Sequence, residues 1–211
     1  MIYACCINVN HFLFVLLPLC APFLYNHRKI VDGEACIRME NDTVLAALSR
    51  EELAALTTLY AKNWLAMDGY WFQSVERGHG MDAAMEHDVA VWRGFTRTEA
   101  RRIKAFLGLP EQAGLDGLAK ALSLRMYARI NQDEIIRTED ALIYRTLSCY
   151  VQRARAEKGL AYHPCKAVGL VEYAGFAKEI DARIHCECIS CYPDVTDTSC
   201  NCAWRFWIEN A

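Results

Sequence analysis

Cysteines are the residues of this 211-residue chain best suited to chemistry: there are 11, and seven of them lie beyond residue 140. Cys188 and Cys191 form a C-x-x-C pair, and Cys202 follows in the next apolar segment. In a C-x-x-C knuckle the two intervening residues fold back, so both thiolates face one ion. The spacing therefore predicts a knuckle at Cys188–Cys191 that contributes, with Cys202, three ligands of a metal site.

A tetrahedral zinc site needs a fourth ligand. Cys165 is the first choice and Cys149 the alternative. Four thiolates could also hold an iron–sulfur cluster. We expect zinc before iron–sulfur. The alternative without metal is a set of buried, reduced thiols that pack as small hydrophobic groups.

Cys165 also suits nucleophilic catalysis, because His163 lies two residues before it. A thiol becomes a nucleophile when a neighbouring base or cation favours its thiolate form. The pair Cys165 and His163 therefore predicts, as a second possibility, a thiol hydrolase without metal. A redox role for the C-x-x-C pair is disfavoured, because a strand leading into a helix is the usual context of such pairs.

Two expected helices carry acidic and aromatic side chains at helical spacing: Asp68, Trp71, Phe72 and Val75 on the first, and Asp88, Trp92, Phe95 and Glu99 on the second. If these stripes face each other, carboxylates and indoles line one cleft suited to a small molecule. Asp68, Trp71, Asp88 and Trp92 are thus the candidate ligand-binding residues. The alternative is helix packing with acidic groups at its rim.

The first half of the domain, residues 39–125, reads as helical. Ser49 and Glu52 form a capping box that predicts the start of a long helix, which Gly80 should end. A second long helix is expected over 81–107, with five core positions on one face. Those positions are Ala84, Val91, Trp92, Phe95 and Ile103. A short third helix is expected over 115–124.

The second half, residues 126–211, reads as a sheet with helices inserted. Strands are expected over 126–137, 141–149, 182–189 and 203–208. Helices are expected over 151–158 and 166–180. Helices followed by strands predict an α+β fold: a helical half, then a β-β-α-β-β unit with a mainly antiparallel sheet.

Residues 1–38 are expected to be a non-native or targeting extension before a single domain over 39–211. Their apolar run over 11–25 is short for a membrane span and contains Pro18 and Pro22. It lacks the basic residues that precede the apolar part of a signal peptide. Met39 directly precedes the predicted domain, which favours a start codon there. The expectation is a cytoplasmic protein with no stable membrane span, or an exported or tethered one if the segment is genuine.

The net charge of −3 argues against nucleic acid as the main partner. A small-molecule ligand is the expected partner, and the sequence does not specify an oligomeric state.

Several motifs resemble a family of prokaryotic proteins known only as a domain of unknown function. They are the segments 48–72 and 99–104, Asp88 with Trp92, P-C-K-A-V-G over 164–169, C-I-S-C over 188–191 and C-A-W-R-F over 202–206. The closing pattern is more distantly similar to the L-2-amino-thiazoline-4-carboxylic acid hydrolase family. That resemblance implies a hydrolase of a small C–N or C–S ring compound, and it carries over Cys149, Cys165, Cys188, Cys191 and Cys202.

The sequence thus leads to a small-molecule-processing or binding protein with a cysteine-ligated metal, and hydrolysis is the reaction that the resemblance suggests. The alternative is a non-catalytic ligand, metal or redox sensor.

Overall fold

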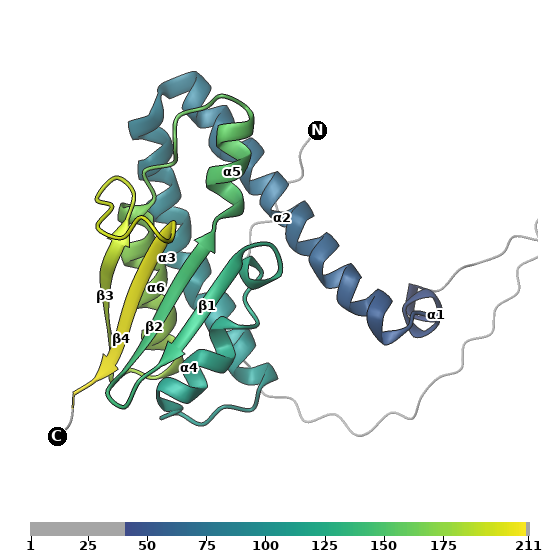
Figure 1. Ribbon diagram of the computed structural model, residues 1–211. Coiled ribbons are helices and arrows are strands. Elements are labelled where there is room, and N and C mark those ends of the chain that lie inside the picture. The colour runs from purple at the N-terminus through teal and green to yellow at the C-terminus, as the bar shows by residue number, and fades with distance from the viewer. Residues whose placement is uncertain (1–40, 210–211) are drawn as a thin grey trace, which may run out of the picture. The chain divides into compact units, whose positions relative to one another are not determined.

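The computed structural model describes residues 41–209 (Figure 1). The predictions for residues 1–38 lie outside this range. The chain divides into two units at Leu45, and the fold described below is that of the second unit, which follows the short helix α1 (Asn41–Ala46). Within residues 41–209, no helix is both long and apolar enough to cross a membrane.

A helical hairpin forms the first part of this unit. Helix α2 (Arg50–His79) starts at the predicted capping box: the N–H of Glu52 donates to Ser49 Oγ at 3.1 Å, and the N–H of Ser49 donates to Glu52 Oε2 at 2.7 Å. Helix α3 (Met81–Phe106) follows after a single residue, Gly80, whose φ of 89° favours glycine. This one-residue turn brings the C-terminal half of α2 against α3.

The remaining elements build a sheet with its covering helices. In chain order they are α4 (Gly114–Leu122), the 3₁₀ turn η1 (Tyr127–Arg129), β1 (Gln132–Arg137), β2 (Ala141–Ser148), α5 (Tyr150–Glu157), α6 (Lys166–Ile180), β3 (Ile184–Cys191) and β4 (Cys202–Ile208). The four strands pair antiparallel in the order β1-β2-β4-β3. The predicted α+β fold is therefore confirmed.

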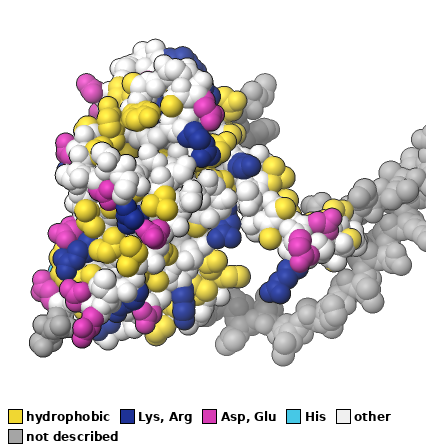
Figure 2. All heavy atoms as spheres, viewed as in Figure 1, with side chains coloured by type: hydrophobic (Ala, Val, Ile, Leu, Met, Phe, Trp, Pro, Cys, Tyr) yellow, Lys and Arg dark blue, Asp and Glu magenta, His cyan; other side chains and the backbone are white. Residues whose placement is uncertain are grey.

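The two faces of the sheet differ, because side chains alternate along each strand. Helices α6 and α4 pack on one face and α3 packs against α6, behind the sheet in Figure 1. The core side chains between these layers are Leu118, Leu122, Leu142, Phe176, Ile180, Ile184, Trp204 and Phe206. The opposite face carries Arg145 paired with Glu134 and Arg205 paired with Glu187, and Figure 2 shows charged side chains among hydrophobic ones on this side.

A buried cation joins the helical half to the sheet half. Arg125 has a side chain that is 0% exposed, and it pairs with Glu99 of α3 at 2.9 Å and with Glu172 of α6 at 2.6 Å. Its guanidinium also lies over the ring of Phe176, 4.9 Å from the centroid. Because the two carboxylates sit beside one cation, burial raises the pKa of Glu172 to about 7 while Arg125 opposes that rise.

Two local predictions are wrong. Cys188 and Cys191 do not form a knuckle: both lie in β3, where pairing with β4 extends the strand to Cys191, with a register shift between Cys188 and Ser190. Val91 is 57% exposed rather than part of the core, because α3 turns its neighbour Trp92 inward.

Candidate functional site

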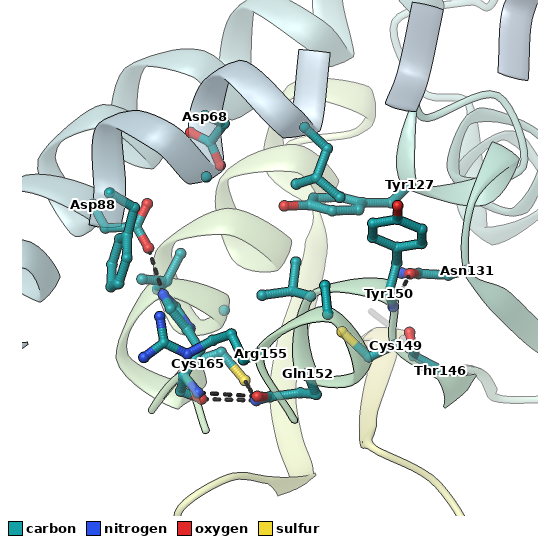
Figure 3. Close-up of a pocket in the computed structure, with 18 of the residues that line it drawn as sticks. Asp68, Asp88, Tyr127, Asn131, Thr146, Cys149, Tyr150, Gln152, Arg155 and Cys165 are labelled. Carbon is teal, nitrogen blue, oxygen red and sulfur yellow. Dashed lines mark hydrogen bonds and ion pairs between the residues drawn. The ribbon is translucent and has the colours of Figure 1, made fainter. Parts of the chain in front are cut away.

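A cavity of about 350 Å³ opens where α2 and α3 meet α5, α6 and the sheet. Its volume is in the range of small-molecule sites. Aromatic side chains supply much of the lining: Phe72, Trp92, Tyr127, Tyr150, Tyr173 and Trp204. Figure 3 shows polar and ionisable side chains from several elements around the same space. The cavity therefore combines apolar walls with a few polar groups.

His163 lies in the loop between α5 and α6 and meets α3 across the cavity. Its Nε2 is 2.9 Å from Asp88 Oδ2, and both side chains are only about one-tenth exposed. With Nε2–H donating to the carboxylate, Nδ1 is the ring nitrogen left for chemistry. Nδ1 is buried, and no hydrogen-bond partner for it exists among residues 41–209.

Gln152 of α5 fixes the loop that carries His163. Its Nε2 donates to the carbonyl of His163 at 2.8 Å, and its Oε1 accepts from the N–H of His163 at 3.0 Å. The same Nε2 lies 3.6 Å from Cys165 Sγ. Figure 3 shows these contacts side by side on one wall of the cavity. One amide group therefore holds the histidine backbone and faces the cysteine sulfur.

Cys165 is the N-cap residue of α6 and follows His163 in a tight turn. Its N–H donates to the carbonyl of His163 at 2.8 Å, which sets the two side chains next to each other. The N-terminal end of a helix carries partial positive charge, which favours a thiolate. The position of Cys165 therefore suits a nucleophile.

Cys191 supports the thiolate from behind. Its sulfur lies 3.5 Å from that of Cys165, and Cys191 itself is 1% exposed. This hydrogen bond lowers the pKa of Cys165, burial opposes it, and the neighbouring His163 imidazolium lowers it further. The pKa of Cys191 is raised for the converse reason, because its S–H serves as the donor. Cys165 is thus the thiolate of the pair and Cys191 the thiol.

His163 is the matching cation. Burial alone lowers its pKa, but the hydrogen bond to Asp88 and the Cys165 thiolate outweigh burial and raise the pKa to about 9. Near neutral pH the resting site is therefore a thiolate beside an imidazolium, held by a carboxylate.

The N-terminal helical hairpin is tied to this loop by Arg155 of α5. Its guanidinium makes two bonds to Glu76 of α2, at 2.9 and 2.7 Å, and it also donates to the carbonyl of Ala161. Phe72 packs on the His163 ring at 4.8 Å between centroids. These contacts connect the end of α2 to the loop that carries the site.

The structure places three of the four candidate ligand-binding residues in the cavity: Asp68, Asp88 and Trp92. Trp71 is 69% exposed and lines a second, shallower hollow instead. Its position four residues before Val75 on α2 turns it away from the main cavity. The two candidate catalytic residues, Cys165 and His163, both line the cavity.

The candidate metal ligands are only partly brought together. Cys165, Cys191, Cys202 and the alternative ligand Cys149 line the cavity, whereas Cys188 does not. Burial raises the pKa of Cys149 to about 12, so it is a poor thiolate. Across residues 41–209, no group of three or more His, Cys, Asp or Glu side chains has an arrangement that could hold a metal ion. Zinc at these cysteines stays a prediction.

Sequence reasoning missed Gln152, Arg155 and Tyr127 as residues of the site. No motif marks Gln152, since a glutamine in a short helix has many structural roles. Its importance comes from contacts made 11 and 13 residues further along the chain. Only the folded loop brings them together.

The fold and the site define an α+β domain with a cysteine, a histidine and an aspartate in one aromatic cavity. Residues 46–208 match a protein family described as Family of unknown function (DUF6125), and the chain belongs to that family. The expected resemblance to a domain of unknown function is thereby confirmed. No curated protein and no solved structure shows significant similarity to the chain.

Proposed function

We propose that this protein is a cysteine-dependent hydrolase that cleaves a C–N bond in a small molecule. Cys165 is the nucleophile, His163 the general acid and base, Asp88 the residue that orients His163, and Gln152 the donor to the developing oxyanion. The observation that carries the proposal is the chain of contacts from Asp88 through His163 to the turn of Cys165, which ends in a cavity. Cysteine, histidine and a carboxylate or amide recur in this arrangement on unrelated folds.

The first step is attack on the carbonyl carbon. The Cys165 sulfur forms a C–S bond, and the electron pair of the carbonyl moves onto its oxygen. Gln152 Nε2–H, which lies 3.6 Å from the sulfur, is placed to donate to that oxyanion. His163 Nδ1–H then gives its proton to the leaving nitrogen as the C–N bond breaks.

The second step releases the acyl group. A water molecule gives its proton to the now neutral Nδ1 of His163 and attacks the thioester carbon. The C–S bond breaks, the carboxylic acid leaves, and proton return restores the thiolate and the imidazolium. If the C–N bond belongs to a ring, both products remain one molecule, which agrees with the ring-opening reaction that the sequence resemblance suggests.

The alternative is a non-catalytic metal or redox sensor that uses the same cysteines. The observation that favours it is the convergence of Cys165, Cys191 and Cys202 on one side of the cavity. The two readings differ in the state of Cys165: a nucleophile is free to react, whereas a metal ligand reacts only after the metal is removed.

The test uses p-nitrophenyl acetate, a generic acyl donor, on the full chain. A hydrolase produces a burst of p-nitrophenolate equal to the enzyme concentration, and peptide mass spectrometry finds one acetyl group on Cys165. Cys165→Ser removes the burst, whereas Cys186→Ser, at a half-buried thiol outside the cavity lining, retains it. Acetylation that is equal at all cysteines, or that appears only after a chelator is added, overturns the proposal.

A further inference from the structure

The cavity contains a carboxylate that the proposed reaction does not use. Asp68 of α2 lines the cavity, and Figure 3 shows its side chain directed into it, away from Cys165. Among residues 41–209, Asp68 has no hydrogen bond and no ion pair within 4 Å. Burial and the nearby charge of Asp88 raise its pKa to about 6, while His163 opposes this rise. An unpaired, half-buried carboxylate is costly unless a cation or donor occupies the space before it.

The buried cations around the cavity are already neutralised. Arg155 is paired with Glu76, Arg125 with Glu99 and Glu172, and His163 with Asp88. The other cations in the lining, Lys62 and Lys158, are exposed. An anionic ligand would therefore find no free buried cation, whereas a cationic ligand would find Asp68.

The apolar walls favour the same kind of ligand. Trp92 and Tyr127 stack at 5.7 Å between ring centroids, and Phe72 lies one turn beyond Asp68 on α2. Aromatic faces attract cations through the ring quadrupole, and more strongly where water is excluded. A planar cation such as an amidinium or guanidinium could contact both the rings and the carboxylate.

We propose that Asp68 selects the substrate: the cavity takes a small molecule with a positively charged amidinium, guanidinium or ammonium group, which pairs with Asp68 while the scissile bond lies toward Cys165. This inference rests on the proposed function for the placement of the scissile bond, but the charge preference is a property of the cavity alone. Asp68 is a specificity residue, since it acts on a part of the substrate remote from the reacting atoms.

The test is a binding measurement with three probes of nearly equal size: benzamidine, benzamide and benzoate. Calorimetric titration of the full chain is expected to give at least about tenfold tighter binding for benzamidine than for benzamide, the size of one well-placed charge-assisted hydrogen bond. Benzoate is expected to bind weakest. Asp68→Asn should remove the preference for benzamidine over benzamide and leave benzamide unchanged.

The matched control is Glu157→Gln, which removes one negative charge from an exposed position in the lining. It should retain the preference for benzamidine. Unchanged binding of benzamide to Asp68→Asn shows that the variant is folded. Equal binding of benzamidine and benzamide to the wild type, or an equal loss in Glu157→Gln, overturns the inference.

The p-nitrophenyl acetate burst separates this inference from the proposed function, because that substrate carries no cation. A burst without a benzamidine preference leaves the hydrolase and removes the role of Asp68. A benzamidine preference without a burst leaves a cation-binding cavity and removes the hydrolase.

Discussion

Asp88 and His163 are 75 positions apart in the chain, yet their side chains meet at 2.9 Å inside the cavity. The contact joins α3 of the helical hairpin to the loop before α6, so the chemistry of the loop depends on the packing of the hairpin. It also decides the charge of His163, since the carboxylate helps to raise the pKa of the imidazole to about 9.

Replacing Asp88 should therefore weaken Cys165 as a nucleophile. In Asp88→Asn the pKa of His163 falls toward about 6.5, so the imidazolium is lost at neutral pH and the pKa of Cys165 rises. Alkylation of Cys165 by iodoacetamide at pH 7 should slow about tenfold, the effect of one pKa unit. Asp82→Asn, at an exposed position of the same helix, should react like the wild type. An unchanged rate in Asp88→Asn would contradict this role.

Asp68 should lower the stability of the protein at neutral pH. Its folded-state pKa of about 6 exceeds the unfolded value near 4, so the folded state loses stability as pH rises from about 4 to 6. Asp68→Asn should then raise the free energy of unfolding at pH 7 by about 1–2 kcal/mol, a range discounted for partial solvent exposure. The gain should vanish below about pH 4. Urea denaturation at both pH values measures it, and a loss of stability at pH 7 would be the opposite result.

Gly169 of α6 should be essential for packing the site against the sheet. A Cβ at this position would lie 2.4 Å from Cζ2 of Trp204, whose buried indole cannot move aside. Gly169→Ala should cost about 1–3 kcal/mol of unfolding free energy through overpacking. Gly94→Ala is the control, because nothing lies within 4 Å of a Cβ there and alanine favours helix by up to about 1 kcal/mol. Thermal melts would show whether the two changes have opposite signs, as expected.

Arg125 should contribute far more to stability than a surface arginine. Arg125→Ala leaves Glu99 and Glu172 buried without their cation and should cost about 3–5 kcal/mol. Arg101→Ala removes an exposed pair with Glu179, 3.0 Å long, and should cost about 1 kcal/mol or less. Chemical denaturation of both variants compares them directly. Similar costs would mean that the buried network is replaceable.

The sequence was sufficient where a signal is local. The capping box at Ser49 predicted the start of α2, and the helix expected over 166–180 is α6 with the same bounds. Neighbours within a few residues carry such signals, so no tertiary contact is needed to read them.

Signals that depend on distant partners were read less well. The C-x-x-C spacing of Cys188 and Cys191 suggested a knuckle, but pairing with β4 keeps both in a strand. Asp88 was expected to bind a ligand, whereas in the structure it holds His163. The alternation along β3 and the contact between α3 and the loop are tertiary effects, which spacing alone does not reveal.

The most direct measurement of the central claim is the pH dependence of Cys165 alkylation in the wild type and in His163→Ala, with each cysteine resolved by mass spectrometry. Cys165 has a lowered pKa, so its thiolate persists as pH falls and its alkylation should continue well below neutral pH. An ordinary thiol slows about tenfold for each pH unit below about 8.5. His163→Ala should shift the Cys165 profile to higher pH. A Cys165 profile that matches an ordinary thiol in the wild type, or that His163→Ala leaves in place, would contradict the thiolate–imidazolium pair.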